Sequence, residues 1–371
     1  MTALLRVMLD QIVAPTDPAS AMASRELARA LVATAPEGCA VVGIVPHAAD
    51  AAALVEASVP GVTELTRAPL PRRELAAAWQ LGVPSSIGGG MIHSPTLLAP
   101  LVKHDRVHDL DQTVVTLWDL DAWERPGELA RTAVTWHRSM LKRAAKHADA
   151  VVVPSHALAE RLSEITALGD RVRVIAGAAP AGFAVPVDEV GRRRALGLPE
   201  GFVMVSGSTA PSARLADAFD AVVRSGVDLP VVVLDVPAED EQAVVALAVD
   251  AGIASESVHV HGALDDADRA AVLGGAVALM APSRLQSFPW RVVEALAVGV
   301  PVIAADSAVH REVVWDGGSL VADVEAMADA LSTVLGSAEV VDRFAVLAAD
   351  RGRAFSWLSA AERVWQLHAD L

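Results

Sequence analysis

The chain alternates short apolar runs with alanine-rich helical segments, and this alternation restricts the folds that it can adopt. Four runs in the first half are apolar or β-branched and end in a polar or proline-containing loop, so each predicts a buried strand. These runs are LLRVML (4–9), AVVGIV (40–45), TVVTLW (113–118) and AVVVPS (150–155). Residues 24–35 and 155–165 have the spacing of amphipathic helices, and Ser155 is placed to cap the second. Strands that alternate with helices predict an α/β fold whose parallel sheet is covered on both faces.

The same pattern starts again after a stretch with the composition of a hinge, AGAAPAGFAVPVD (176–188), which is rich in small residues and proline. Five more strands are predicted, at FVMVSGS (202–208), PVVVLDV (230–236), SVHVHG (257–262), AVALMAPS (276–283) and VPVIAADS (300–307). The sequence therefore predicts two doubly wound Rossmann-like domains, residues 1–180 and 189–354, that face a central cleft. Residues 355–371 are predicted to form a helix that crosses back to the first domain.

Charge and composition exclude several classes of protein. The formal net charge is −16, and an acidic surface repels phosphate backbones, so no nucleic-acid partner is expected. Cys39 is the only cysteine, which excludes an internal disulfide and a cysteine-cluster metal site. The only lysines are Lys103, Lys142 and Lys146, so the second half has none for a Schiff base or for pyridoxal phosphate. No run of about 18 residues is entirely apolar, which predicts a cytoplasmic protein with at most peripheral membrane contact.

Five segments, taken in order, cover nearly the whole chain and resemble one known family. They are MIHSPTLLAPL (91–101), TVVTLWDLDAWERP (113–126), ADAVVVPSHALAERL (148–162), RVRVIAGA (171–178) and the long run APSRLQSFPWRVVEALAVGVPVIAADSAVHREVVWDGGSLV (281–321). The chain resembles the retaining glycosyltransferases of family 4, which have the GT-B fold. The resemblance implies transfer of a sugar from a nucleotide diphosphate donor to an acceptor that the sequence does not identify. It implies no bound metal and no other cofactor, because the nucleotide sugar is a substrate.

The resemblance also assigns roles to residues of the second domain. Two glutamates eight apart hold the donor in this family, one at the sugar and one at the ribose. Glu294 stands at the ribose position, whereas Gln286 replaces the sugar-binding glutamate with an uncharged amide, which forms weaker hydrogen bonds. Proline at position 289 removes an N–H from the loop, or alternatively starts the following helix. Glu312 matches a further family position.

The family places an Arg-Lys pair near the pyrophosphate, after the first strand of this domain, and that pair is missing here. Gly207 and Ser208 remain in this loop, and Arg214 lies one step beyond the expected position, where it either substitutes or is a solvated residue. Arg284 and Arg291 flank the later loop and are candidates to supply the missing charge. Without replacement of two charge-assisted contacts, nucleotide diphosphate affinity is predicted to be weaker than usual by about 2–4 kcal/mol.

The first domain departs from the family in the same way. The glycine-rich turn after the first strand is replaced by APTDPASAMASREL, so side chains of residues 19–24 are expected where a ligand would lie. Trp118 replaces a histidine beside the reacting sugar and either stacks on the sugar or fills the core, whereas Asp119 remains. His93 is expected at the cleft rim. The basic helix 136–150 is either a patch for an anionic acceptor or membrane, or a solvated face.

Two hypotheses follow from these departures. The first is a working transferase with an altered donor site, in which Trp118, Asp119 and Gln286 act at the sugar. The second is a catalytically degenerate homologue, a pseudoenzyme that keeps the fold and acts as a partner or scaffold, for instance of an active glycosyltransferase. The sequence alone does not decide between an enzyme and this second reading.

Overall fold

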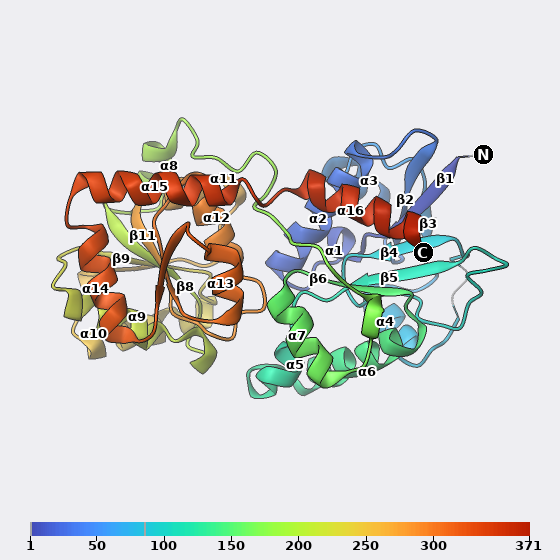
Figure 1. The fold of residues 1–371 in the computed structure, drawn as a ribbon, viewed down its shortest axis with the longest axis horizontal. Coiled ribbons are helices and arrows are strands. Elements are labelled where there is room, and N and C mark those ends of the chain that lie inside the picture. The colour runs from blue at the N-terminus through green and yellow to red at the C-terminus, as the bar shows by residue number, and fades with distance from the viewer. Residues whose placement is uncertain (1, 85–86) are drawn as a thin grey trace. The chain divides into compact units, whose positions relative to one another are not determined.

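The computed structural model describes residues 2–84 and 87–371 and divides the chain into two compact units (Figure 1). The first unit runs to Gly177 and also includes Ser356–Leu371, and the second unit is Ala178–Phe355. Each unit contains one parallel sheet with helices packed on it. The predicted α/β architecture with two Rossmann-like domains is therefore confirmed.

The first unit is built on a seven-stranded sheet in the order β3-β2-β1-β4-β5-β6-β7. Its strands are β1 (Ala3–Met8), β2 (Cys39–Val45), β3 (Leu65–Arg67), β4 (Met91–Ser94), β5 (Gln112–Thr116), β6 (Ala150–Val153) and β7 (Val172–Val174). Its helices are α1 (Asp10–Val13), α2 (Pro18–Ala33), α3 (Ala51–Ser58), α4 (Arg72–Gln80), α5 (Asp121–Glu124), α6 (Arg131–His147), α7 (His156–Ile165) and α16 (Trp357–Asp370), with short 3₁₀ turns at Pro126–Glu128 and Gly169–Arg171.

The second unit is built on a six-stranded sheet in the order β10-β9-β8-β11-β12-β13. Its strands are β8 (Phe202–Ser206), β9 (Val231–Leu234), β10 (Val258–Val260), β11 (Ala276–Ala281), β12 (Val302–Ala305) and β13 (Gly318–Val321). Its helices are α8 (Glu189–Ala195), α9 (Leu215–Ser225), α10 (Glu241–Ala251), α11 (Asp266–Gly275), α12 (Trp290–Val298), α13 (Ala308–Val314), α14 (Val324–Val334) and α15 (Ala338–Gly352), with 3₁₀ turns at Pro211–Ala213, Ala238–Asp240 and Ser255–Ser257.

Helix starts follow the sequence closely. The Ser155 hydroxyl accepts a hydrogen bond from the Leu158 N–H at 3.1 Å, so the predicted cap of α7 is confirmed. Helix α2 begins earlier than predicted, because Asp17 caps it through the Ser20 N–H at 2.8 Å and Pro18 occupies its first turn. At the other end of the chain, α16 packs on α2, and the Trp365 indole N–H donates to the Leu31 carbonyl at 3.1 Å.

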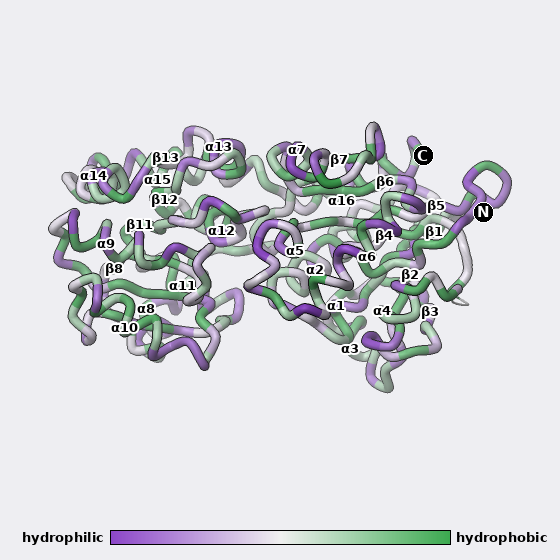
Figure 2. The backbone as a smooth tube through the Cα atoms, turned by 90° about the horizontal axis from the view of Figure 1, so that it is seen from below, coloured by the Kyte–Doolittle hydropathy of each residue, from purple (hydrophilic) through white to green (hydrophobic). Residues whose placement is uncertain are grey.

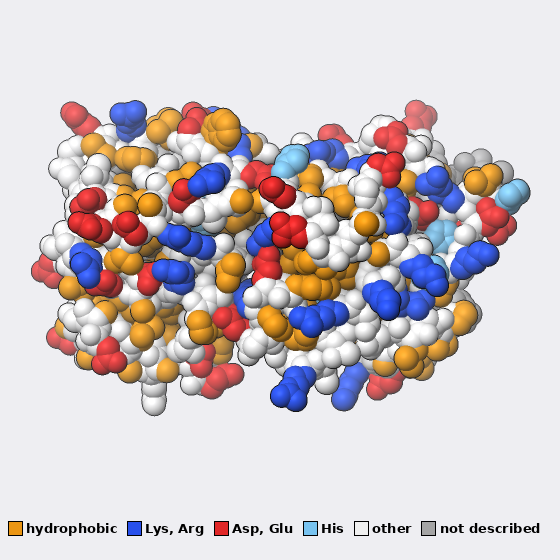
Figure 3. Space-filling model, turned by 60° about the horizontal axis from the view of Figure 1, so that its bottom comes forward, with side chains coloured by type: hydrophobic (Ala, Val, Ile, Leu, Met, Phe, Trp, Pro, Cys, Tyr) orange, Lys and Arg blue, Asp and Glu red, His pale blue; other side chains and the backbone are white. Residues whose placement is uncertain are grey.

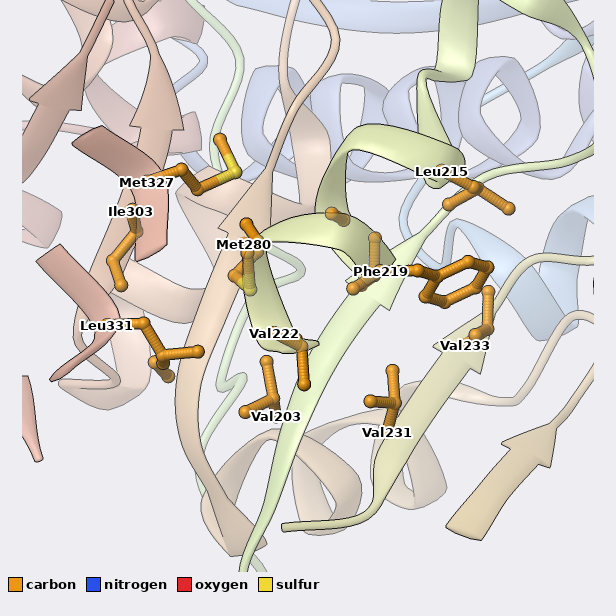
Figure 4. Close-up of a cluster of buried hydrophobic side chains, with 14 of the residues drawn as sticks. Val203, Leu215, Phe219, Val222, Val231, Val233, Met280, Ile303, Met327 and Leu331 are labelled. Carbon is orange, nitrogen blue, oxygen red and sulfur yellow. The ribbon is translucent and has the colours of Figure 1, made fainter. Parts of the chain in front are cut away.

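The core of the second unit lies between its sheet and helices α9, α10 and α14. Figure 4 shows Phe219 of α9 beside Val233 of the sheet and Val222 beside Val203, all of them at most 3% exposed. Along the chain, hydrophobic stretches alternate with polar ones, as the colours of Figure 2 show. This is the pattern expected for parallel strands that are buried on both faces.

Four strands, β3, β4, β7 and β13, lie outside the predicted runs. They are only three or four residues long, and β13 includes Gly318 and Ser319, which have low strand propensity, so local sequence gives a weak signal. The expectation for His93 was wrong: it lies inside β4, pairs in register with Val7 and Val114, and is fully buried. Among the described residues, no helix is both long and apolar enough to span a membrane.

Candidate functional site

The strand order of the second unit indicates where a ligand would bind. The order reverses between β8 and β11, and in doubly wound sheets ligands bind outside the carboxyl ends of the strands at this reversal. The loop after β8 contains Gly207, Ser208 and Arg214, and the loop after β11 contains Arg284 and Gln286. The topology alone therefore brings five of the predicted site residues to one edge of one sheet.

The loop after β8 turns back sharply. Gly207 has a φ of +145°, and a Cβ on it would lie 3.0 Å from the Ala213 Cβ, so the close approach requires glycine. The Ser208 hydroxyl accepts from the Ala210 N–H at 3.2 Å. Arg214 has a φ of +53°, an unfavourable conformation for a residue other than glycine, and its Nε donates to the Asp217 Oδ2 at 2.6 Å. Backbone strain of this kind is concentrated at functional sites.

Arg214 and Arg284 line one depression, together with Asp217, Asp323 and apolar neighbours. Arg284 is exposed and donates to the Ala322 carbonyl. The depression has a volume of only about 10 Å³, which is room for roughly one water molecule. A diphosphate can therefore bind between these two arginines only if their side chains move away from their present partners.

Gln286 differs from its neighbours because one of its polar atoms has no partner. Its side-chain oxygen is buried and accepts no hydrogen bond from any residue that the structure describes. Most buried polar atoms in proteins are hydrogen-bonded, and an orphaned acceptor calls for a specific explanation. An amide oxygen in this condition is ready to accept a hydrogen bond from a hydroxyl group of a ligand.

Glu294 lies on α12, is fully buried and is held by two arginines (residues 269 and 291). Arg269 donates from Nε to both carboxylate oxygens at 3.0 Å and from Nη2 to Oε1 at 2.9 Å. Arg291 donates from Nη1 to Oε2 at 2.6 Å. The other edge of the Arg291 guanidinium binds Asp235 through Nε at 2.7 Å and Nη2 at 2.8 Å. We call these four residues the Glu294 network.

The Glu294 network contains two carboxylates and two guanidinium groups, and Arg269 also donates from Nη2 to Asp266 Oδ1 at 2.8 Å. Burial by itself lowers the pKa of Arg291, but Glu294 and Asp235 outweigh it and raise that pKa well above its ordinary value. Asp235 directly follows β9 and has a φ of +64°, so it is also strained. The sequence identified Glu294 and Arg291. It missed Arg269, which no motif marks, and Asp235, which its place at the end of a buried strand would have indicated.

Helix α13 also starts at this edge of the sheet. The Ser307 hydroxyl caps it through the His310 N–H at 3.2 Å. The buried His310 ring lies with Nδ1 2.8 Å from the Ala305 carbonyl, and burial lowers its pKa, so the ring is neutral and donates through Nδ1. Its Nε2 is then an acceptor that has no partner among the described residues. Glu312 is half-buried on the same helix, and its backbone carbonyl accepts from Arg351 Nη2 at 2.6 Å.

The remaining predicted site residues, Trp118 and Asp119, belong to the first unit, directly after β5. The Trp118 indole N–H donates to the Pro95 carbonyl at 2.8 Å, and its ring meets Trp357 of α16 edge-on at 6.3 Å between centroids. These contacts favour the core-filling role for Trp118. Burial, followed by the charge of Asp121, raises the pKa of Asp119 to about 6, so this carboxyl group can exchange a proton near neutral pH.

The loop after β1 carries a polar cluster that the sequence did not indicate. Asp10 is fully buried, and its Oδ2 accepts from Arg72 Nε at 2.9 Å and from Gln11 Nε2 at 2.8 Å. Its Oδ1 has no hydrogen-bond partner among the described residues. Residues 19–24 lie in α2, so this unit has a helical turn where the family has a glycine-rich one. In the described part of the chain, no three His, Cys, Asp or Glu side chains are arranged to hold a metal ion.

Part of the chain is similar in sequence to known glycosyltransferases. Residues 203–337 match the family Glycosyl transferases group 1. A phosphatidyl-myo-inositol mannosyltransferase of Mycobacterium leprae (strain TN) is 34% identical over 123 residues, which is 32% of this chain and 33% of the relative. The alignment thus spans about a third of the length of that relative.

Solved structures resemble the chain over its whole length. A sucrose-phosphate synthase from Thermosynechococcus elongatus aligns with a TM-score of 0.73 and 18% identity, covering 99% of this chain and 98% of that one. Anabaena HepE in complex with UDP-glucose aligns with a TM-score of 0.71 and 15% identity, covering 99% and 100%. At such low identities these structures establish the fold alone. The chain has the GT-B fold, and residues 203–337 of its second unit are similar to the glycosyl transferases of group 1.

Proposed function

We propose that the protein is a retaining glycosyltransferase of family 4 type that moves a sugar from a nucleotide diphosphate donor to an acceptor. The observation that carries this proposal is the orphaned oxygen of Gln286, buried at the edge of the sheet where the order of strands reverses. A buried acceptor without a partner among the described residues suits a donor site of this fold, because a sugar hydroxyl can supply its hydrogen bond. HepE, a structural neighbour of this chain, was solved in complex with UDP-glucose, which supports a donor of this class.

The residues at this edge of the sheet have separate proposed roles in the reaction. The Gln286 amide oxygen accepts a hydrogen bond from a sugar hydroxyl, and Glu294 accepts one from the ribose. The bond between the anomeric carbon and the diphosphate breaks, and a new bond forms to an oxygen of the acceptor, so negative charge develops on the leaving diphosphate. Arg214 and Arg284 stabilise that charge, with Gly207 and Ser208 allowing the backbone to approach. No metal or cofactor is needed for these steps, and the nucleotide sugar is consumed as a substrate.

Residues outside this group support the donor or the acceptor side. Glu312 lies half-buried on α13, which starts at the same edge of the sheet as the donor site. In the first unit, the raised pKa of Asp119 suits it to take up a proton near neutral pH, whereas Trp118 packs on Trp357 within that unit. The reaction would take place in the cytoplasm, where nucleotide sugars are available.

The proposal is tested by calorimetric titration of the protein with a panel of nucleoside diphosphates and nucleotide sugars. For the wild-type protein, we expect saturable binding of one nucleotide sugar. Gln286→Ala should weaken that binding about threefold to tenfold and leave the matching nucleoside diphosphate unaffected, because only the sugar contact is removed. Gln242→Ala, an exposed glutamine on α10, is the matched control. If Gln286→Ala weakens binding of the nucleotide sugar and of the nucleoside diphosphate equally, Gln286 does not contact the sugar.

A second candidate function is a degenerate homologue that serves as the partner of an active glycosyltransferase. The Glu294 network favours it, since arginine N–H groups already contact both oxygens of Glu294. The shallow depression at Arg214 and Arg284 points in the same direction. Titration with the same panel separates the two candidates: absence of binding by every nucleotide would reject the transferase and leave the partner role.

A further inference from the structure

The first unit contains a cavity that the proposed donor chemistry does not use. It has a volume of about 600 Å³, within the range of about 300–1,000 Å³ found for small-molecule sites. Its walls come from the loop before β5 (residues 102–104 and 106), from the segment that ends directly before β6 (146–149), from the start of β7 and the turn before it (170, 171 and 173) and from residues 370–371. The cavity is therefore at the amino ends of the strands, the opposite edge from the one where doubly wound sheets bind their substrates.

The cavity gathers positive charge in an acidic protein. The chain carries a net charge of −16 and only three lysines, yet two of those lysines, Lys103 and Lys146, line this cavity together with Arg106. Figure 3 shows Lys and Arg side chains gathered on one face of the first unit. All three side chains are exposed, and no salt bridge within 4.0 Å is found for them in the described part of the chain. The hydrogen bonds from His108 lower the pKa of Asp105, and the charge of Lys103 adds a smaller effect. The Asp105 carboxylate receives its hydrogen bonds from Val107 and His108, not from Lys103.

A carboxylate in the wall is already neutralised by a neighbouring histidine. His104 Nε2 lies 2.8 Å from Asp149 Oδ2, and His104 Nδ1 lies 2.9 Å from the Val102 carbonyl. Both ring nitrogens thus face acceptors, an arrangement that the doubly protonated imidazolium satisfies. Burial opposes this charge, but the hydrogen bonds to Val102 and Asp149 outweigh it and raise the pKa of His104. Asp149 also accepts from the Thr113 N–H at 2.8 Å, so it is held in place and its charge is matched.

The partial negative charge at the C-terminal end of α6 is also offset. A helix C-terminus carries partial negative charge, which would repel an anion. Arg171 offsets it, donating to the Ala148 carbonyl at 2.9 Å and to the Ala145 carbonyl at 2.8 Å. The other carboxylate side chains in the wall are Asp170 and Asp370, fewer than the lysine and arginine side chains that line it. The cavity therefore keeps an excess of positive charge after its internal contacts are counted.

We propose that this cavity binds a small phosphate-bearing anion, at a site separate from the donor site. Lysine and arginine together are the side chains that proteins use for phosphate groups, the first as a point charge and the second as a planar fork. A phosphate monoester carries a charge of about −2, and its several oxygens can accept hydrogen bonds from Lys103, Arg106 and Lys146. It can belong to a soluble phosphorylated molecule or to the headgroup of an anionic lipid, because both present the same group to the cavity.

The test uses inorganic pyrophosphate as the soluble probe, titrated calorimetrically into the full chain at low ionic strength. The double variant Lys103→Ala/Lys146→Ala should weaken binding about tenfold or more, because two charge-assisted contacts are removed. Lys142→Ala is the matched control, since Lys142 is the third lysine, is exposed on α6 and does not line the cavity. Arg284→Ala removes charge from the donor site, so the pyrophosphate binding that remains in this variant and is lost when Lys103→Ala/Lys146→Ala is added belongs to the cavity. All substituted residues are exposed, so the variants are expected to fold, as circular dichroism would verify.

A second arm measures flotation of the same variants with phosphatidylglycerol vesicles and with neutral phosphatidylcholine vesicles. Binding of pyrophosphate, or of the anionic vesicles only, that is lost in the double variant and kept in both control variants supports the proposal and identifies the source of the phosphate. Binding that the double variant retains, or no binding of either probe, overturns it. Neither result bears on the transferase proposal, because the cavity and the donor site share no residue.

Discussion

Each unit buries a polar cluster, and the two units deal with the cost of burial in different ways. In the second unit, Glu294 remains charged because Arg269 and Arg291 neutralise it. In the first unit, His93 and His368 are buried side by side and remain neutral, with His93 Nδ1 3.3 Å from His368 Nε2 and His368 Nδ1 3.0 Å from Gln112 Oε1. Removing a charge from water is costly, and the usual solutions are a paired charge or loss of the charge.

This difference teaches how each cluster can respond to its surroundings. In an ion-pair network, a polar ligand can replace one of the charged partners. A neutral histidine pair has no charge that a ligand could replace. Because protonation would place a charge in the buried interior, acid destabilises the packing of α16, which contains His368. The Glu294 network is therefore suited to binding, and the histidine pair to holding the first unit together.

The largest expected effect follows from breaking the paired cluster. Glu294→Ala leaves Arg269, which is 6% exposed, without its main counter-charge, and we expect the free energy of unfolding of the second unit to fall by about 3–5 kcal/mol. Urea unfolding followed by circular dichroism measures this loss. Asp329→Ala, an exposed carboxylate on α14, is the control and should change stability by less than about 0.5 kcal/mol. If Glu294→Ala lowered the free energy of unfolding by less than about 0.5 kcal/mol as well, the network would not hold a buried charge.

The next effect comes from acid acting on the neutral cluster. Burial lowers the pKa of His368 to about 4, and burial together with His368 lowers the pKa of His93 well below its ordinary value. Unfolded histidine takes up a proton near pH 6.5, so below that pH the unfolded chain binds protons that the folded chain refuses. Stability is therefore fully present above about pH 6.5 and is lost as the pH falls toward 4, by about 2 kcal/mol between pH 7.5 and pH 5 for His368 alone.

Urea unfolding at the two pH values, followed by tryptophan fluorescence, would show this dependence. His368→Gln removes the titrating ring and should reduce the change with pH by about 2 kcal/mol, whereas His108→Gln, at an exposed histidine of the same unit, should not alter it. An unchanged slope in His368→Gln would show that the pair takes up its protons in the folded state.

The contrast between the clusters also shows what the sequence could predict. The alternation of strands and helices predicted both sheets, because parallel strands covered on both faces must be apolar throughout. The loops after β8 and β11 were predicted to carry the site from the family resemblance, and the strand order brings them to one edge. His93 was placed wrongly because a histidine beside a serine resembles a loop, and nothing local shows that His368, far along the chain, covers it.

The partners of Glu294 could not be predicted for a similar reason. Arg269 is 25 residues away on another helix, and its direction toward Glu294 depends on how α11 packs against α12. The sequence shows which side chains can carry charge, but tertiary packing decides whether a charged side chain faces a ligand or pairs with a neighbouring side chain. This is why Arg291, a candidate for pyrophosphate, is found between two carboxylates.

The smallest effect tests whether the paired cluster can exchange a partner with a ligand. Arg291→Ala removes the donor 2.6 Å from Glu294 Oε2 and leaves Arg269 to neutralise the carboxylate, so the fold should be retained. If Glu294 holds the ribose, nucleoside diphosphates should bind about threefold to tenfold more tightly, because the ribose hydroxyl no longer competes with a guanidinium. Calorimetry measures the change, with Arg311→Ala, an exposed arginine paired with Asp306, as the control. Weaker binding would show instead that Arg291 contacts the donor directly, and equal binding that the Glu294 network is closed to nucleotides, so that both clusters serve the fold alone.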